Sequence, residues 1–130
     1  MKFIFSLIIL LISGVIIGQE RQKSHGIVGV RSVTLLMLGS FVFAYMSDKI
    51  GGDPARIVAQ VVSGVGFIGA GLIFKKDSDK IANITTAILM WCLASVGCLI
   101  GLGFIIESVV IVLIIYLVLK YYKNLFTDGS

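Results

Sequence analysis

Glu107 is the only acidic or basic residue in the longest apolar run of the chain, which extends from Ile84 to Leu119. As a single helix this run would be roughly 54 Å long, whereas the hydrocarbon core of a bilayer is about 30 Å thick. We therefore expect it to fold back near Gly101 to Glu107 as two membrane-spanning helices. With 58% hydrophobic and 14% charged residues, a chain of 130 residues cannot bury its apolar surface as a soluble domain. The sequence thus predicts an integral membrane protein.

Charged breaks divide the rest of the sequence in the same way and predict an all-α, polytopic helical bundle of about five membrane spans. The expected spans are approximately residues 3–18, 30–46, 55–74, 84–101 and 104–120. A single Pro and the lack of a linker-like stretch predict one membrane domain over residues 1–130. The apolar run after Lys2 also resembles a signal peptide. Gly14 and Gly18 disfavour that alternative, because their GxxxG spacing is typical of helix packing.

The distribution of basic residues predicts the orientation of the bundle. If the N-terminus lies outside, the inside segments carry eight of the 11 Lys and Arg residues and the outside segments carry three. Cytoplasmic loops of membrane proteins are enriched in Lys and Arg, so we expect an outside N-terminus and an inside C-terminus. The net charge of +4 does not indicate nucleic-acid binding, because the basic residues are confined to short loops.

The stretch from Asp53 to Phe74 separates into two faces when it is drawn as a helix. One face is apolar, and the other carries small and polar residues: Arg56, Ala59, Gln60, Ser63, Gly64, Gly66, Phe67, Ala70 and Gly71. Membrane helices place small residues where they pack against protein. We therefore expect this face to pack against protein, to carry function, and to leave the apolar face to lipid.

The span at 84–101 repeats this pattern, since Asn83, Ala87, Ala94, Cys98 and Gly101 share one face. We expect the two small-residue faces to meet. The glycines predicted to allow close helix packing are Gly14, Gly18, Gly64, Gly66, Gly69, Gly71, Gly97 and Gly101. So many small-residue positions also favour a homo-oligomer.

Three patterns do not indicate chemistry in this chain. Residues 64–69 read G-x-G-x-x-G, but that dinucleotide fingerprint requires a strand before it and a helix after it, and here it lies inside an apolar helix. Cys92 and Cys98 would lie roughly 9 Å apart along one helix, too far for a disulfide. No nucleophile, base and orienting partner occur together, so we expect neither enzymatic activity nor a cofactor.

Ionisable side chains at or inside a membrane are costly and by default mark pathways or partners. Glu20 and Arg21 close the first span, and Arg31 opens the second. Two interpretations stay open for them. They form an ion-paired cluster at the cytoplasmic entrance, or the arginines anchor the helices at the lipid headgroups.

A second polar group lies at the opposite end of the bundle. Asp53 fits an N-cap with a proline at the first helical position, while Arg56 shares a face with Gln60 and Ser63, which lie deeper in the span. An arginine and an amide suit an anion, a lipid headgroup or the carboxylate of another protein. A magnesium site needs several oxygen ligands, and none of the seven acidic residues is expected deep within a span.

The order of several motifs resembles the MgtC/SapB family of membrane proteins. The motifs are G-x-x-x-G-x-Glu-Arg at residues 14–21, G-x-Arg at 29–31, DPARIVAQVVSGVGFIGAG at 53–71, and Thr85-Thr86-Ala87 followed by Trp91. The resemblance implies about five spans and a cytoplasmic C-terminus, and it adds Asn83, Thr85 and Thr86 to the candidate residues. Asn83 stands where the family usually has Gly, and we expect it to turn the chain or cap the helix.

The resemblance also implies a function. It indicates a non-enzymatic protein of the bacterial cytoplasmic (inner) membrane that supports growth at low magnesium or under stress by binding membrane lipids or other complexes. Family members are described as modulators of the ATP synthase and of P-type ATPases. The alternative is a small oligomeric transporter or channel for magnesium or another ion, with its path along the third and fourth helices. Many members continue into a soluble ACT-like domain. We expect none within these 130 residues, so its functions are not carried over.

Overall fold

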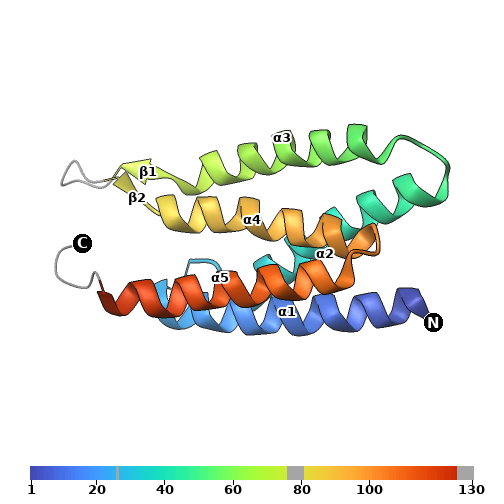
Figure 1. The fold of residues 1–130 in the computed structure, drawn as a ribbon. Helices are drawn as coiled ribbons and strands as arrows, with labels where there is room; N and C mark the ends of the chain where they lie inside the picture. Colours follow the sequence, from blue (N-terminus) through green and yellow to red (C-terminus); the bar gives the residue numbers. More distant parts are fainter. Residues whose placement is uncertain (26, 76–80, 126–130) are drawn as a thin grey trace.

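Five helices, arranged up and down beside one another, make up nearly all of the computed structural model, which describes residues 1–25, 27–75 and 81–125 (Figure 1). The helices are α1 (Lys2–His25), α2 (Val30–Lys49), α3 (Pro54–Leu72), α4 (Ile84–Gly101) and α5 (Ile105–Leu125). The predicted all-α, polytopic bundle is confirmed.

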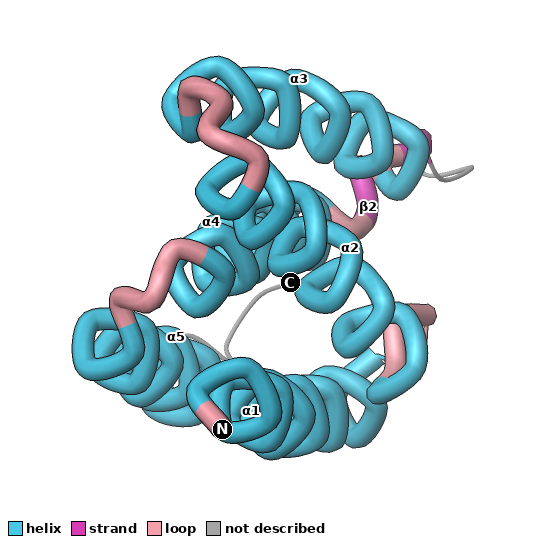
Figure 2. Tube along the Cα trace, turned by 90° about the vertical axis from the view of Figure 1, so that its right-hand side faces the viewer, coloured by secondary structure: helices cyan, strands magenta, loops and turns pink. Residues whose placement is uncertain are grey.

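The helices are arranged around α4. Seen from the end of the bundle in Figure 2, α3 lies along one edge, α1 and α5 lie along the opposite edge, and α2 and α4 lie between them. The most extensive contact joins α2 to α4, and α4 also touches each of the other helices. The fourth helix is therefore the centre of the bundle, while α3 is peripheral.

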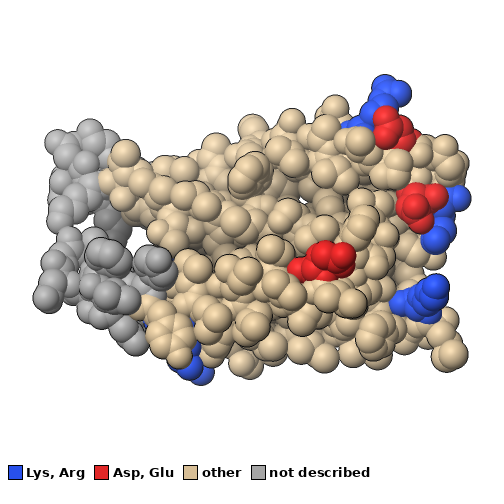
Figure 3. All heavy atoms as spheres, viewed as in Figure 1, with Lys and Arg blue, Asp and Glu red and all other residues tan. Residues whose placement is uncertain are grey.

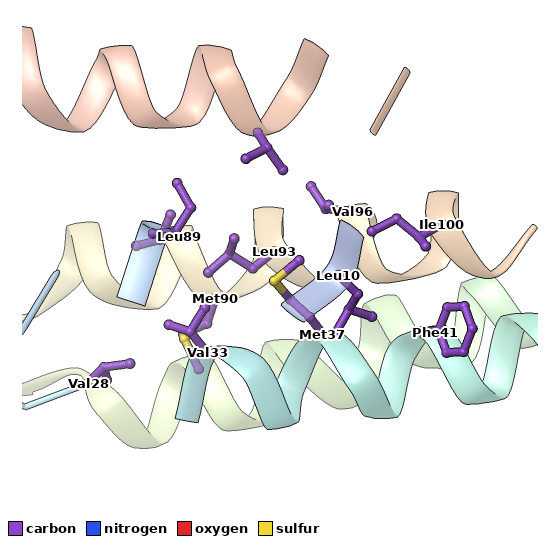
Figure 4. Packing of buried hydrophobic residues seen from close by; sticks show 12 residues of the cluster. Leu10, Val28, Val33, Met37, Phe41, Leu89, Met90, Leu93, Val96 and Ile100 are labelled. Atoms are coloured by element: carbon purple, nitrogen blue, oxygen red, sulfur yellow. The ribbon is translucent and has the colours of Figure 1, made fainter. Parts of the chain in front are cut away.

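The apolar core fills the space between α2, α4 and α1 (Figure 4). Phe41 and Met37 of α2 pack with Leu93 of α4 and Leu10 of α1, and each of these side chains is at most 1% exposed. Many other large apolar side chains lie on the outer surface of α1, α2, α3 and α5. An apolar exterior of this extent is what a lipid environment requires.

The lengths and composition of the helices fit a bilayer. Within residues 1–25, 27–75 and 81–125, four helices, α1 to α4, are long and apolar enough to span a membrane. In Figure 3 the charged side chains on the visible face lie at the ends of the bundle, except for an acidic group over the start of α5, where Glu107 is in the first turn. A negative charge is favourable there, because the N-terminus of a helix carries a partial positive charge.

Several helices extend beyond the predicted spans. α1 continues past Gly18 to His25, since residues 19–25 contain no Gly or Pro and include good helix formers. α2 and α5 end at Lys49 and Leu125 for the same reason, whereas α3 ends at Leu72, before the predicted boundary. An apolar run in the sequence marks only the part of a helix within the hydrocarbon core. The helix itself can continue through polar residues beyond that run.

The turn between α4 and α5 falls within the segment where the sequence predicts it. Gly103 has a left-handed backbone with φ of 89°, which favours glycine. Its N–H donates to the carbonyl of Ile100 at 3.1 Å, and the N–H of Phe104 donates to that of Leu99 at 2.9 Å. These two bonds form a Schellman motif, which ends α4 and reverses the chain within three residues.

The charged segment between α3 and α4 is not entirely a loop. Strand β1 (Phe74–Lys75) pairs antiparallel with strand β2 (Ile81–Ala82), so the two helices are joined by a short hairpin. The part of the predicted loop at 76–80 lies outside the described residues. The two strands contain only two paired residues each, which is too short for an alternating apolar–polar pattern to predict them from the sequence.

Candidate functional site

The start of α3 is fixed by its first residues. The Oδ1 atom of Asp53 accepts a hydrogen bond from the backbone N–H of Ala55 at 3.0 Å, and Pro54 is the first helical residue. This is the N-cap that the sequence predicts. Asp53 is exposed, so its other carboxylate oxygen can accept a bond from outside the chain.

The polar side of α3 points away from the rest of the bundle. Val65 and Gly69 are the buried residues of this helix, and Val58, Val61 and Leu72 on the same side are half-buried. The opposite side, called the α3 polar face below, consists entirely of exposed residues: Arg56, Ala59, Gln60, Ser63, Gly64, Gly66, Phe67, Ala70 and Gly71.

This orientation corrects two expectations from the sequence. The apolar side of α3, and not its small and polar side, packs against α2 and α4. The small-residue faces of α3 and α4 consequently do not meet within the chain. Gly69 is the small residue on the packed side, and a Cβ added there would make an ordinary van der Waals contact with α4, 3.5 Å from the carbonyl oxygen of Ala87. The valines on the same side then pack around this point.

Three polar side chains run along the α3 polar face from the end of the helix inward. Arg56 is in the first turn, and Gln60 and Ser63 follow roughly 6 and 10 Å deeper along the axis. Ser63 donates to the carbonyl of Ala59 at 3.3 Å, within its own helix. Among the described residues, the side chains of Arg56 and Gln60 have neither a hydrogen-bond partner nor an ion-pair partner.

Open grooves flank α3 on both sides. The groove between α2 and α3 has a volume of about 770 Å³, and the groove between α3 and α4 has a volume of about 410 Å³. Gln60 and Gly64 line the first groove opposite Gly39 of α2. The second groove is almost entirely apolar, with Val58, Val62 and Trp91 among its lining residues. Among the residues that the structure describes, neither groove is lined by an acidic or basic side chain.

Arg21 lies near the opposite end of the bundle and is buried between helices. Its side chain is 7% exposed, and Nη2 donates to the hydroxyl of Thr86 in α4 at 2.6 Å. Nε is buried and has no hydrogen-bond partner among the described residues. A guanidinium held in this way connects the end of α1 to the start of α4, which neither sequence interpretation of Arg21 anticipated.

Among the described residues, the other candidate side chains at this end of the bundle do not bind Arg21. Within the described part of the chain, neither Arg21 nor Arg31 forms an ion pair with Glu20, and Arg31 and Thr85 are exposed. Asn83 stands at the N-cap position of α4 and turns the chain there, but its side chain makes no capping hydrogen bond among the described residues. Its backbone is left-handed, with φ of 65°, and its side-chain amide donates to the carbonyl of Leu72 at 3.1 Å. Asn83 therefore ties the start of α4 to the last residue of α3.

Apart from Gly69, which makes the ordinary contact described above, the predicted packing glycines fall into two groups. At Gly14, Gly18, Gly97 and Gly101, an added Cβ would collide with α2. Gly97 and Gly101 lie against the carbonyls of Met37 and Phe41, respectively. At Gly64, Gly66 and Gly71 an added Cβ would meet no described atom within 4 Å. Gly64, Gly66 and Gly71 thus make no packing contact with the described part of this protomer.

Two buried hydroxyls were missed from the sequence. Thr34 and Ser47 of α2 each have a side-chain oxygen that is buried without a hydrogen-bond partner among the described residues. Thr34 lies against Gly14, so matching the GxxxG motif to the following helix would have identified it. Ser47 has no distinguishing sequence signal.

The described residues do not form a metal site of the usual kind. No three His, Cys, Asp or Glu side chains among them come close enough to hold a metal ion together. The arrangement instead offers a cation, an amide and small residues on one outward face. These groups can donate hydrogen bonds to a ligand or allow a helix to approach closely.

Comparison with known proteins gives a consistent assignment. Residues 7–127 match the MgtC family. The chain is similar to Protein MgtC of Brucella abortus (43% identical, covering 75% of this chain and 41% of that protein) and to Protein MgtC of Salmonella typhimurium (39%, covering 78% and 44%). An uncharacterized protein of Haemophilus influenzae is 36% identical, with 82% and 50% covered. The chain thus spans about two fifths to half of these relatives. No solved structure matches it.

Proposed function

The chain belongs to the MgtC family of membrane proteins, and on that premise we propose that it is a non-enzymatic protein of the bacterial inner membrane that acts by binding. Its α3 polar face would contact lipids or other membrane complexes and in this way support adaptation to low magnesium or stress. ATP synthase and P-type ATPases are candidate complexes through the family resemblance.

The observation that carries this proposal is the outward position of Arg56 and Gln60 on a membrane helix. Acyl chains offer no hydrogen bonds, so a polar side chain facing them lacks the partners that it has in water. Polar side chains in spans otherwise face protein or a water-filled cavity. A binding partner would supply the missing acceptors, and the cationic end of the face suits an anionic headgroup or a carboxylate.

The test compares Arg56→Ala with Lys49→Ala in cells that lack the chromosomal copy of this protein. Lys49 is an exposed cation at the end of α2, shortly before α3, and it pairs with Asp48. We expect both variants to reach wild-type abundance, because both side chains are exposed. Growth at low magnesium should fail with Arg56→Ala and be normal with Lys49→Ala. Normal growth with Arg56→Ala at equal abundance would refute the proposal.

The competing function is transport of magnesium or another ion along α3 and α4. The apolar lining of the groove between these helices makes it a poor path for a hydrated cation. Magnesium uptake into proteoliposomes with an internal fluorescent indicator decides between the two functions. We expect no uptake under an imposed gradient. Uptake by the wild type that Arg56→Ala lacks would instead establish a transport path past this residue.

A further inference from the structure

We propose that a second copy of this chain covers the α3 polar face, so that two α3 helices run parallel about a two-fold axis normal to the membrane. This inference rests on the proposed function, since it names a partner for the same face. Copies inserted by the same topology signals have the same orientation, and a two-fold axis along the membrane normal brings the same face of both together.

The spacing of the α3 polar face is that of a helix–helix seam. Arg56, Gln60, Ser63, Phe67 and Ala70 follow one another at intervals of four, three, four and three residues, the repeat that keeps one stripe facing a partner helix. Phe67 is the large side chain of this stripe and is 84% exposed. A single bulky residue between small ones can insert into a partner as a knob.

Small residues border the seam on both sides. Ala59 and Gly66 lie along one edge, and Gly64 and Gly71 lie along the other. The three glycines have open space around them in the protomer, so packing within the chain does not require them. In a membrane, glycines at such positions allow two backbones to approach closely, which improves the van der Waals packing that helps to drive helix association there.

The polar groups of the face are complementary to themselves. The Gln60 amide contains both donors and an acceptor, so two copies meeting at the axis can bond to each other. In such a dimer the two Arg56 side chains come close and repel each other. Asp53 lies one turn earlier and uses only Oδ1 to cap the helix, so its negative charge can offset this repulsion. Each arginine can therefore pair with Asp53 of the second copy. This complementarity favours a second copy over a bare lipid surface.

Disulfide cross-linking in native membranes tests the dimer. Cys92 and Cys98 are first replaced by Ala, and single cysteines are then introduced by Ser63→Cys and, as a matched control, Val62→Cys. Both positions are exposed at nearly the same depth, but Val62 is about 100° away around the helix. With copper phenanthroline, Ser63→Cys should give mostly disulfide-linked dimer and Val62→Cys should stay monomeric. Equal cross-linking at both positions, or no dimer with Ser63→Cys, would overturn the proposal.

Leucine substitutions at two glycines test whether dimer formation depends on the α3 polar face in particular. Gly66→Leu in the Ser63→Cys chain should lower the dimer fraction by about fivefold or more, because it blocks close approach of the helices. Gly39→Leu, at a glycine of α2 that also has open surroundings, should leave the dimer fraction unchanged. If Gly66→Leu also left the dimer fraction unchanged, the α3 polar face would not be the dimer contact. Growth that depends on Arg56, combined with no Ser63→Cys dimer, would retain the proposed function and reject the second copy as partner.

Discussion

At the level of single residues, the contact between Arg21 and Thr86 determines how the first and fourth helices meet. Among the described residues, Thr86 is the one side chain that hydrogen-bonds the buried guanidinium. The two residues are 65 positions apart in sequence, so the contact constrains the whole bundle. Hydrogen bonds to charged groups are stronger than neutral ones, and leaving such a group unpaired in the interior is expensive.

We expect Thr86→Val to destabilise the folded protein by about 1.5–3 kcal/mol, because it keeps the shape of the side chain but removes the acceptor. Thermal denaturation in detergent measures the effect as a lower midpoint. Thr85→Val is the matched control, since Thr85 is the exposed neighbour and its replacement should leave the midpoint unchanged. Equal midpoints for both variants would show that the bond contributes nothing.

At the level of helices, contact depends on where glycines meet a neighbouring backbone. Gly97 and Gly101 allow α4 to lie against the carbonyls of α2, while Gly14 and Gly18 allow α1 to lie against the other part of α2. α2 is thus held between two glycine-bearing helices. The glycines of α3 differ, because they lie on its outward side, away from α2 and α4.

Alanine substitutions should distinguish a glycine that touches a neighbouring backbone from one with open space around it, by the sign of their effect on stability. Gly97→Ala forces its Cβ against the Met37 carbonyl and Ser40, and we expect a loss of about 1–3 kcal/mol. Gly39→Ala meets no described atom within 4 Å, so improved helix propensity should add about 0.5–1 kcal/mol. Unfolding in a denaturing detergent measures both. A loss of stability from Gly39→Ala would contradict the packing described here.

At the level of the whole molecule, the predicted orientation can be tested with two exposed positions at opposite ends of the bundle. Asp48→Cys and Gln22→Cys, in a chain without other cysteines, leave the Lys and Arg distribution unchanged. With the N-terminus outside, a membrane-impermeant maleimide should label Asp48→Cys in intact cells and Gln22→Cys only after permeabilisation. The reverse pattern would mean that the end of the bundle that carries Arg21 and Lys23 lies outside.

The sequence predicts the five helices well, because apolar runs and charged breaks follow directly from the cost of placing polar groups in lipid. It does not predict which face of α3 turns inward. Periodicity shows which residues share a face, but in a membrane both protein and lipid are apolar neighbours, so hydrophobicity alone does not orient the helix. The burial of Arg21 is also hidden, because its partner Thr86 lies far away in sequence.

The central place of α4 has a consequence for the order of events during synthesis. Inside the bundle, 61% of its membrane span is buried, compared with 11% for α3, although α3 is made first. Helices emerge from the ribosome in sequence, and helix association follows insertion. Before α4 arrives, α1 and α2 can already pack against each other, but the surfaces of α2 and α3 that contact α4 are still uncovered. Until the fourth arrives, the nascent protein lacks the most extensive contact of its bundle, and we expect quality-control proteases and chaperones to reach it more easily than the finished protein.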